Sequence, residues 1–296
     1  ERDLHPSLDL VWNGRAFTTN TFGMRDQQYS LQKPAGTYRI ALLGPSHAMG
    51  NGVADGETFE HLVEQRLNSQ QESNDPRRFE ILNFAVDGFT LPQELAMLED
   101  RVLQFAPDMV IVTHYHRGRT MTEAYLGKIT WKQIPVSEEL RAILARAGLD
   151  HVDRGSVPIP TEMGRALAGK LGLEPRMPQG EFEARVRRIS DAVNDWALER
   201  IATVARENGA IPALLALNAV IDDAPADIPN IEAIRRAQYL VFDLFDVFPA
   251  QDRALLKVAP WDEHPNAMGH QVIADALYTQ LLGALPPEKL SNLTHP

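Results

Sequence analysis

Residues 38–53 read Tyr-Arg-Ile-Ala-Leu-Leu-Gly-Pro-Ser-His-Ala-Met-Gly-Asn-Gly-Val, and this stretch decides the fold class. Its first part, Tyr38–Leu43, is apolar and predicts a buried strand that stops at the pair Gly44-Pro45, which does not continue a strand comfortably. Further runs that are apolar on both faces, as buried parallel strands are, occur at Phe79–Phe84, Met109–Thr113 and Ile211–Leu217.

Stretches with helical spacing alternate with these strands, at Glu57–Leu67, Pro92–Phe105 and Glu181–Asn208. This alternation favours a doubly wound α/β sheet. A last helix is predicted after Pro265-Asn266, with a face toward the sheet formed by Met268, Val272, Ala276 and Leu277.

Residues from about 118 to 180 break the alternation and predict an insertion. It contains two short helical pieces, Ser137–Ala147 and Glu162–Leu171. We therefore expect a lead-in arm over residues 1–35 and one α/β domain over residues 36–290 that carries the insertion.

Composition excludes several classes of function. The formal net charge is −11 and no basic stripe occurs, so the chain does not fit a nucleic-acid binder or a protein that docks on anionic lipid. Cysteine is absent, which excludes disulfides, thiolate metal sites and cysteine nucleophiles. No apolar run reaches the roughly 18 residues that span a bilayer and no signal peptide opens the chain, so we expect a soluble protein without direct membrane insertion.

The sequence leaves the source and the compartment partly open. Arginine outnumbers lysine, which indicates a GC-rich bacterial source and leaves both a cytoplasmic and a periplasmic location open. Because residue 1 is Glu, we expect that a segment ahead of it was cleaved or left out.

A serine stands where the first predicted strand ends. Open α/β sheets build their sites at the carboxyl ends of their strands, and the glycines near Ser46 permit a tight turn. If a helix begins here, its first N–H groups can face a negatively charged oxygen. Ser46 is therefore a candidate nucleophile, with a helix cap as the alternative. The adjacent His47 is either a second base or a residue that packs in the turn.

A second candidate segment, Trp261–Asn266, lies just ahead of the last predicted helix. Serine is a poor nucleophile unless a neighbouring base takes its proton, and imidazole suits that task near neutral pH. His264 is the candidate base and Asp262 the acid that orients it. The alternative is a solvated, charged start of the helix in which His264 has no function.

Together these segments, RIALLGPSHAMGNGV at 39–53 and DEHPNAMGHQVIADAL at 262–277, resemble the SGNH (GDSL-like) hydrolase family. The resemblance extends to Thr21–Asp26, Asn83–Phe89 and Pro107–Val112, and it covers residues from about 20 to 118 and from 211 to 284. It implies a flavodoxin-like three-layer α/β/α sandwich with a mainly parallel sheet and a helical insertion.

The resemblance also implies roles for particular residues. Ser46 matches the family's nucleophile, His264 its base, and Gly88 a glycine whose N–H helps to hold the oxyanion. Asp262 matches the acidic partner, although it lies two residues before the histidine where the commonest spacing is three, a place that Trp261 takes here. No metal or organic cofactor is expected.

Two positions depart from the family's pattern. Pro45 replaces the aspartate that normally precedes the serine, which removes a bracing side chain and an N–H, so we expect a remodelled turn. The third-block asparagine, an oxyanion donor, falls at Arg117, with His116 beside it as a further substrate-binding candidate. Arg117 then replaces the lost donor, clamps an anionic group of the substrate, or pairs with carboxylates of this acidic chain.

The leading hypothesis is a serine esterase that removes an acyl group, such as an acetyl group, from a carbohydrate or small-molecule ester. One alternative is an O-acyltransferase with the same triad. The other is a binding or scaffold protein on an inactive SGNH fold, which Pro45 and Arg117 favour, since loss of one oxyanion donor typically costs about 100-fold to 1000-fold in rate. The sequence assigns neither the acyl acceptor nor the oligomeric state.

Overall fold

The computed structural model describes residues 3–69, 78–132, 134–149, 179–221 and 227–285. The chain divides into two compact units. The larger unit combines residues 1–116 with 198–296, and the smaller unit spans residues 117–197. The arm at 1–35 and the insertion at 118–180 stay predictions as domain boundaries.

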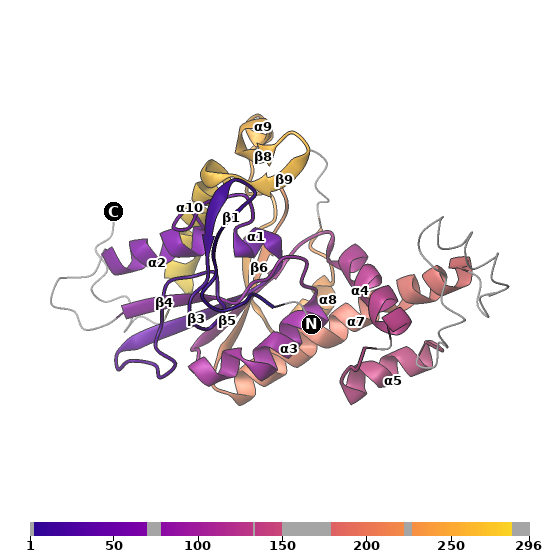
Figure 1. Ribbon diagram of the computed structural model, residues 1–296. Helices are drawn as coiled ribbons and strands as arrows, with labels where there is room; N and C mark the ends of the chain where they lie inside the picture. Colours follow the sequence, from indigo (N-terminus) through magenta and orange to yellow (C-terminus); the bar gives the residue numbers. More distant parts are fainter. Residues whose placement is uncertain (1–2, 70–77, 133, 150–178, 222–226, 286–296) are drawn as a thin grey trace. The chain divides into compact units, whose positions relative to one another are not determined.

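The larger unit is built on a five-stranded parallel sheet (Figure 1). Its strands are β3 (Thr37–Leu43), β4 (Arg78–Asn83), β5 (Met109–His114), β6 (Ile211–Leu217) and β7 (Leu240–Leu244). The spatial order β4-β3-β5-β6-β7 is the flavodoxin-like order 2-1-3-4-5 of a doubly wound sheet. The predicted fold class is confirmed, and four strands lie within one residue of their predicted bounds.

Helices cover both faces of this sheet, which gives a three-layer α/β/α sandwich (Figure 1). They are α2 (Phe59–Ser69) and α10 (Ala267–Ala284) on one face, and α3 (Leu91–Asp100) with the end of α7 (Gln179–Glu207) on the other. On the first face Phe59 and Leu277 pack in one core with Ile40 and Ile111. On the second face an ion pair of 3.3 Å between Arg200 and Glu99 joins α7 to α3.

Two helix predictions need correction. The helix predicted to run to Phe105 ends at Asp100, and a 3₁₀ helix η1 (Val102–Phe105) follows it. The predicted inner face of α10 is correct in part, because Leu277 is buried and Val272 and Ala276 pack against the core, whereas Met268 is 56% exposed. His270 also points inward with no exposure, and Asn266 caps the helix by accepting a hydrogen bond from Gly269 N at 3.1 Å.

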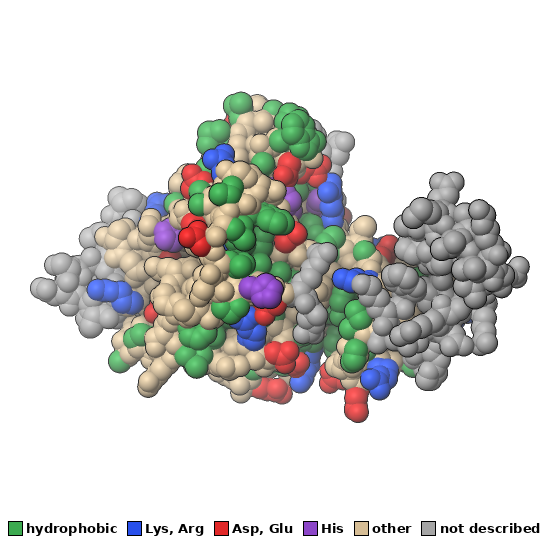
Figure 2. Space-filling view, viewed as in Figure 1, with side chains coloured by type: hydrophobic (Ala, Val, Ile, Leu, Met, Phe, Trp, Pro, Cys, Tyr) green, Lys and Arg blue, Asp and Glu red, His purple; other side chains and the backbone are tan. Residues whose placement is uncertain are grey.

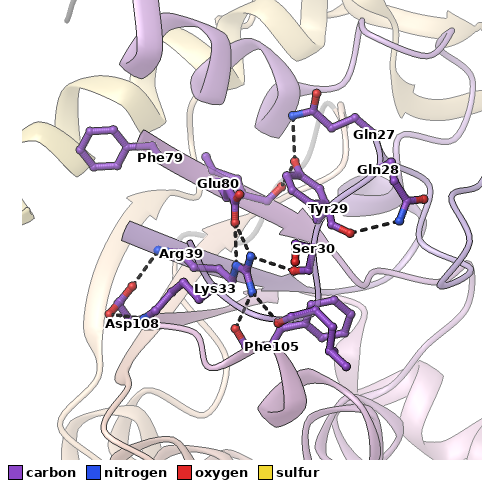
Figure 3. A network of polar contacts seen from close by, with 12 residues as sticks. Gln27, Gln28, Tyr29, Ser30, Lys33, Arg39, Phe79, Glu80, Phe105 and Asp108 are labelled. Carbon is purple, nitrogen blue, oxygen red and sulfur yellow. Dashed lines mark hydrogen bonds and ion pairs between the residues drawn. The ribbon is translucent and has the colours of Figure 1, made fainter. Parts of the chain in front are cut away.

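A polar network ties the lead-in segment to the amino end of the sheet (Figure 3). Arg39 on β3 is fully buried and its guanidinium lies 2.6 Å from a carboxylate oxygen of Glu80 on β4. The same guanidinium donates to Ser30 O at 3.0 Å, and Asp108 accepts from Arg39 N at 2.7 Å and from Lys33 Nζ at 2.8 Å. Ahead of this network lies a small hairpin of β1 (Asp9–Trp12) and β2 (Arg15–Thr18).

The smaller unit is helical. It contains α4 (Gly118–Lys132), α5 (Glu138–Arg146) and the first part of α7. Its core is formed by Leu126, Ile129, Leu140, Leu144, Leu149, Phe182, Val186 and Val193. The predicted piece Ser137–Ala147 is confirmed, with Ser137 as its N-cap, whereas Glu162–Leu171 lies outside the described residues. Among the helices that the structure describes, none has the length and apolar character needed to cross a membrane.

Candidate active site

Ser46 opens a one-turn helix, α1 (Ser46–Met49), directly after β3. Pro45 stands at the N-cap position in extended conformation, and its carbonyl accepts from Ala48 N and Met49 N, both at 3.0 Å. The missing N–H of proline does little harm here because the first N–H groups of a helix have no intrahelical partner. The alternative in which Ser46 is only the cap is wrong, since Pro45 occupies that position and no side chain caps the helix.

The turn is braced from the lead-in segment and from β4. Arg25, whose side chain is 3% exposed, donates to the carbonyls of Met49 at 3.2 Å, of Val53 at 2.6 Å and of Gly50. Asn83, at the end of β4, donates from Nδ2 to Ala48 O at 2.9 Å. The backbone around α1 is thus held without the aspartate that Pro45 replaces, although nothing in the sequence pattern assigned this role to Arg25.

Asp262 and His264 lie on a short strand, β9 (Asp262–Pro265), which pairs with β8 (Lys257–Ala259). Side chains two residues apart on a strand point to the same face, so the spacing of two brings both side chains together. His264 Nδ1 lies 2.6 Å from Asp262 Oδ1, and His264 Nε2 lies 2.7 Å from Ser46 Oγ. The alternative of a charged helix start is wrong as to structure, because Asp262–Pro265 is a strand.

The hydrogen bonds of His264 define its tautomer. A carboxylate only accepts, so Nδ1 carries the proton that faces Asp262 and neutral His264 presents a lone pair at Nε2. The Ser46 hydroxyl therefore donates to Nε2. The same Asp262 oxygen also accepts from His264 N at 3.1 Å, which fixes the carboxylate against the strand. This arrangement of a serine, an imidazole and a carboxylate is the one that activation of a serine by a base requires.

Gly88 lies in the turn after β4 with φ of 73°, a conformation that favours glycine. A hydrogen bond of 3.1 Å from Val86 N to Gly44 O holds this segment beside the turn that leads into Ser46. No described residue accepts a hydrogen bond from the Gly88 N–H. The Ser46 N–H, at the first helical position, has no partner within the helix. Both groups are therefore candidates to hold an oxyanion.

His116 follows β5 and is fixed by Asn218, which follows β6. His116 Nδ1 lies 2.9 Å from Asn218 Oδ1, while Asn218 Nδ2 donates to Phe245 O at 3.0 Å, a bond that sets the amide orientation. Nδ1 of His116 therefore carries a proton, and Nε2 donates to an oxyanion only when His116 is protonated. Arg117 begins the smaller unit, so its predicted part in the site stays a prediction.

Two further histidines near these segments are structural. Burial lowers the pKa of His114 to about 4, and its Nε2 lies 3.0 Å from Pro229 O. Burial also lowers the pKa of His270 to about 3, and its Nδ1 accepts from Phe59 N at 3.0 Å. Both are neutral near pH 7. Within the described ranges, no group of three or more His, Cys, Asp or Glu side chains is arranged to hold a metal ion.

Buried carboxyl groups gather where Asp26 of the lead-in segment meets α2. Burial and the nearby Glu60 and Glu64 raise the pKa of Asp26 well above its usual value, and burial raises the pKa of Glu64 to about 7. Asp26 accepts from Asn83 N at 2.9 Å, which links these groups to the end of β4. A cavity of about 180 Å³ lies beside Asp26, Glu60 and Arg25.

Comparison with known proteins finds similarity at the level of solved structures. No family model and no curated protein matches the chain. The chain is similar to LAE5, an alpha/beta hydrolase enzyme from the metagenome of Lake Arreo, with TM-score 0.45 and 18% identity over 82% of this chain and 94% of that one. It is also similar to TesA, with TM-score 0.44 and 13% identity over 84% of this chain and 100% of that one.

A third similar structure is Axe2, an acetylxylan esterase from Geobacillus stearothermophilus. Its TM-score is 0.46, with 12% identity over 82% of this chain and 94% of that one. At these scores and identities the likenesses define neither a family nor an activity. The fold is therefore assigned from the strand order, and the candidate site from the distances between Ser46, His264 and Asp262.

Proposed function

We propose that this chain is a serine hydrolase that cleaves acyl esters, with Ser46 as nucleophile, His264 as base and Asp262 as the orienting acid. One observation carries the proposal: the continuous hydrogen-bonded series from Asp262 Oδ1 to His264 Nδ1 at 2.6 Å and from His264 Nε2 to Ser46 Oγ at 2.7 Å. The serine and the histidine lie 218 residues apart in the chain, so the fold assembles the contact.

The proposed reaction runs in two stages. Ser46 Oγ attacks the acyl carbon while its proton passes to His264 Nε2, and the N–H groups of Ser46 and Gly88 hold the oxygen that becomes negative. The imidazolium, stabilised by Asp262, then protonates the leaving alcohol, which departs and leaves an acyl-serine. Water, activated by the same base, attacks the acyl-serine and releases the acid.

We propose a small acyl group, such as acetyl, on a carbohydrate or other small molecule as the substrate. The surface beside the triad supports a substrate with apolar parts. Trp261, directly before Asp262, is 87% exposed, and Leu255 and Met268 are 65% and 56% exposed. Figure 2 shows hydrophobic side chains gathered at the top of the molecule, over α9 (Arg253–Leu256) and the β8–β9 hairpin. Apolar side chains that gather on one part of a surface are more typical of binding sites than those scattered singly.

The two alternatives fare differently. A scaffold without chemistry needs no contact between Ser46 and His264, so the distance of 2.7 Å favours an enzyme. An O-acyltransferase uses the same three residues with a sugar hydroxyl in place of water. An assay with an activated acyl donor and a carbohydrate acceptor separates these two activities by their products.

The test is turnover of p-nitrophenyl acetate and butyrate, together with labelling by a fluorophosphonate. Ser46→Ala and His264→Ala are expected to lose at least about 1000-fold in kcat/KM while remaining folded, and labelling is expected at Ser46 only. Ser69→Ala is the matched control, because its hydroxyl donates to Arg66 O at the exposed end of α2, away from the triad. No turnover together with no labelling of Ser46 would refute the hydrolase.

A further inference from the structure

The second residue of α1, His47, packs its ring on the ring of His264. The two ring centroids lie 4.6 Å apart with an interplanar angle of 30°. His47 is 9% exposed. A catalytic base candidate is thus covered on one face by a second imidazole that comes from the residue next to the nucleophile.

His47 also packs against a second aromatic ring. Its ring centroid lies 5.6 Å from that of Tyr115, and Tyr115 lies 6.0 Å from His116 in an edge contact. The segment after β5 therefore holds His47 in place, and β5 itself is hydrogen bonded to β3, from which α1 follows. The position of the His47 ring on His264 is set by the sheet and not by a mobile surface chain.

Ser46 and His47 reach the same ring from two directions. Ser46 Oγ approaches Nε2 at a hydrogen-bond distance of 2.7 Å, and His47 lies against the face of the ring. Asp262 holds the remaining nitrogen at 2.6 Å. Three contacts of different direction leave the imidazole little freedom to rotate away from the serine, and small errors in such geometry cost large factors in rate.

We infer that His47 is a positioning residue for His264, which holds the ring toward Ser46 and shields one face of it from water. This inference rests on the proposed function for the role of His264. It assigns His47 neither proton transfer nor contact with the substrate, and so differs from a second base.

The shielding has a consequence for pH dependence. Removal of the His47 ring would admit water to this face of His264, and water stabilises imidazolium over imidazole. Other groups that interact with this pair include Asp262, which stabilises imidazolium, Tyr115, which packs on His47, and His270, which interacts electrostatically with His264 and with Arg25.

The experiment compares the pH profile of kcat/KM for wild type, His47→Ala and His47→Phe. We expect His47→Ala to lower kcat about 10-fold near neutral pH with little change in KM, and to move the acidic limb upward by about half a pH unit or more. His47→Phe places a flat aromatic ring on the same face of His264 and again excludes water from it. We therefore expect most of the wild-type activity and an acidic limb of the pH profile close to that of wild type. His61→Ala is the matched control, because His61 contacts Gln65 on its own helix.

Several results would overturn the inference. One is a pH profile of kcat/KM for His47→Ala whose acidic limb coincides with that of wild type. Another is a profile for His47→Phe whose acidic limb is shifted as far as that of His47→Ala. If His47→Ala does not fold, His47→Gln carries the same comparison, since it also lacks the ring.

A titration of the His264 imidazole by NMR in wild type and in the His47 variants separates the proposed hydrolase function from the positioning role of His47. If wild type shows no turnover but the His264 titration moves in His47→Ala, the hydrolase fails and the positioning role stands. If turnover depends on Ser46 while the titration and the pH profile do not respond to His47, the positioning role fails alone.

Discussion

Replacement of Asp262 by Asn tests the triad at its least usual position, two residues before the histidine. The amide keeps the size of the side chain but offers an N–H as well as a carbonyl oxygen. If the amide nitrogen of the new side chain faces His264, it donates a hydrogen bond to Nδ1 of the imidazole. Nδ1 is then the acceptor, and Nε2 carries the proton of the ring. The ring then cannot take the proton of Ser46, even though every heavy atom stays in place.

The magnitude follows from the charges. When His264 becomes imidazolium, the Asp262 carboxylate lies 2.6 Å from its Nδ1, and both side chains are about a quarter exposed. Unit charges with centres about 4 Å apart attract by about 4 kcal/mol at an effective dielectric constant of about 20. That loss alone corresponds to about 1000-fold in rate, and the wrong tautomer increases it, so we expect a loss of about 1000-fold to 10,000-fold in kcat.

The assay is hydrolysis of p-nitrophenyl acetate across a range of pH, with urea unfolding to confirm the fold. Glu263→Gln is the matched control, since Glu263 lies between Asp262 and His264 on β9, where successive side chains point to opposite faces. A kcat of Asp262→Asn within about tenfold of wild type would refute the assignment of Asp262 as the orienting acid.

Three further predictions concern stability and packing. Arg39→Met is expected to lower the free energy of unfolding in urea by about 3–5 kcal/mol, because it leaves Glu80 without its buried partner; a loss under about 1 kcal/mol would contradict this. Burial raises the pKa of Glu94 to about 8, so the native state keeps a proton that the unfolded state loses above about pH 4.5, and stability falls as pH rises between these values. Glu94→Gln should therefore gain about 1–3 kcal/mol over wild type near pH 8 and nothing below about pH 4.5, and an equal gain at both pH values would exclude this cause. Gly44→Ala should lower both melting temperature and activity, because the added Cβ would lie 2.7 Å from Ala48 Cβ and 2.8 Å from Thr113 Cβ; an unchanged melting temperature would show that α1 moves aside freely.

The central strands were predictable because helices cover both of their faces, which requires apolar residues at nearly every position. β3, β5 and β6 are buried on both faces by helices, so they read as continuous apolar runs. β7 was missed because it is an edge strand with only two of its five residues buried. The β8–β9 hairpin was missed because its strands have three and four residues, too few for a periodic signal.

The contact between Ser46, His264 and Asp262 was predictable, but the residues that support it were not. The two segments with Ser46 and His264 stand out by their order and wording, and the structure brings Ser46, His264 and Asp262 together. The roles of Arg25, Asn218 and His47 depend on contacts between distant segments, which no local pattern encodes. The inward face of α10 was predicted only in part, since Leu277 is buried but Met268 is exposed, and the polar His270, which an apolar pattern passes over, is fully buried.

Arg25 has a consequence for transplanting this serine turn into another protein. Three carbonyls that follow Ser46, those of Met49, Gly50 and Val53, share one guanidinium from a segment that precedes the first sheet strand. A graft of β3 and α1 alone would leave these carbonyls to water and let the loop behind the nucleophile relax. The smallest portable unit therefore begins upstream of the α/β repeat, and a chimera should carry the lead-in segment with the serine it supports.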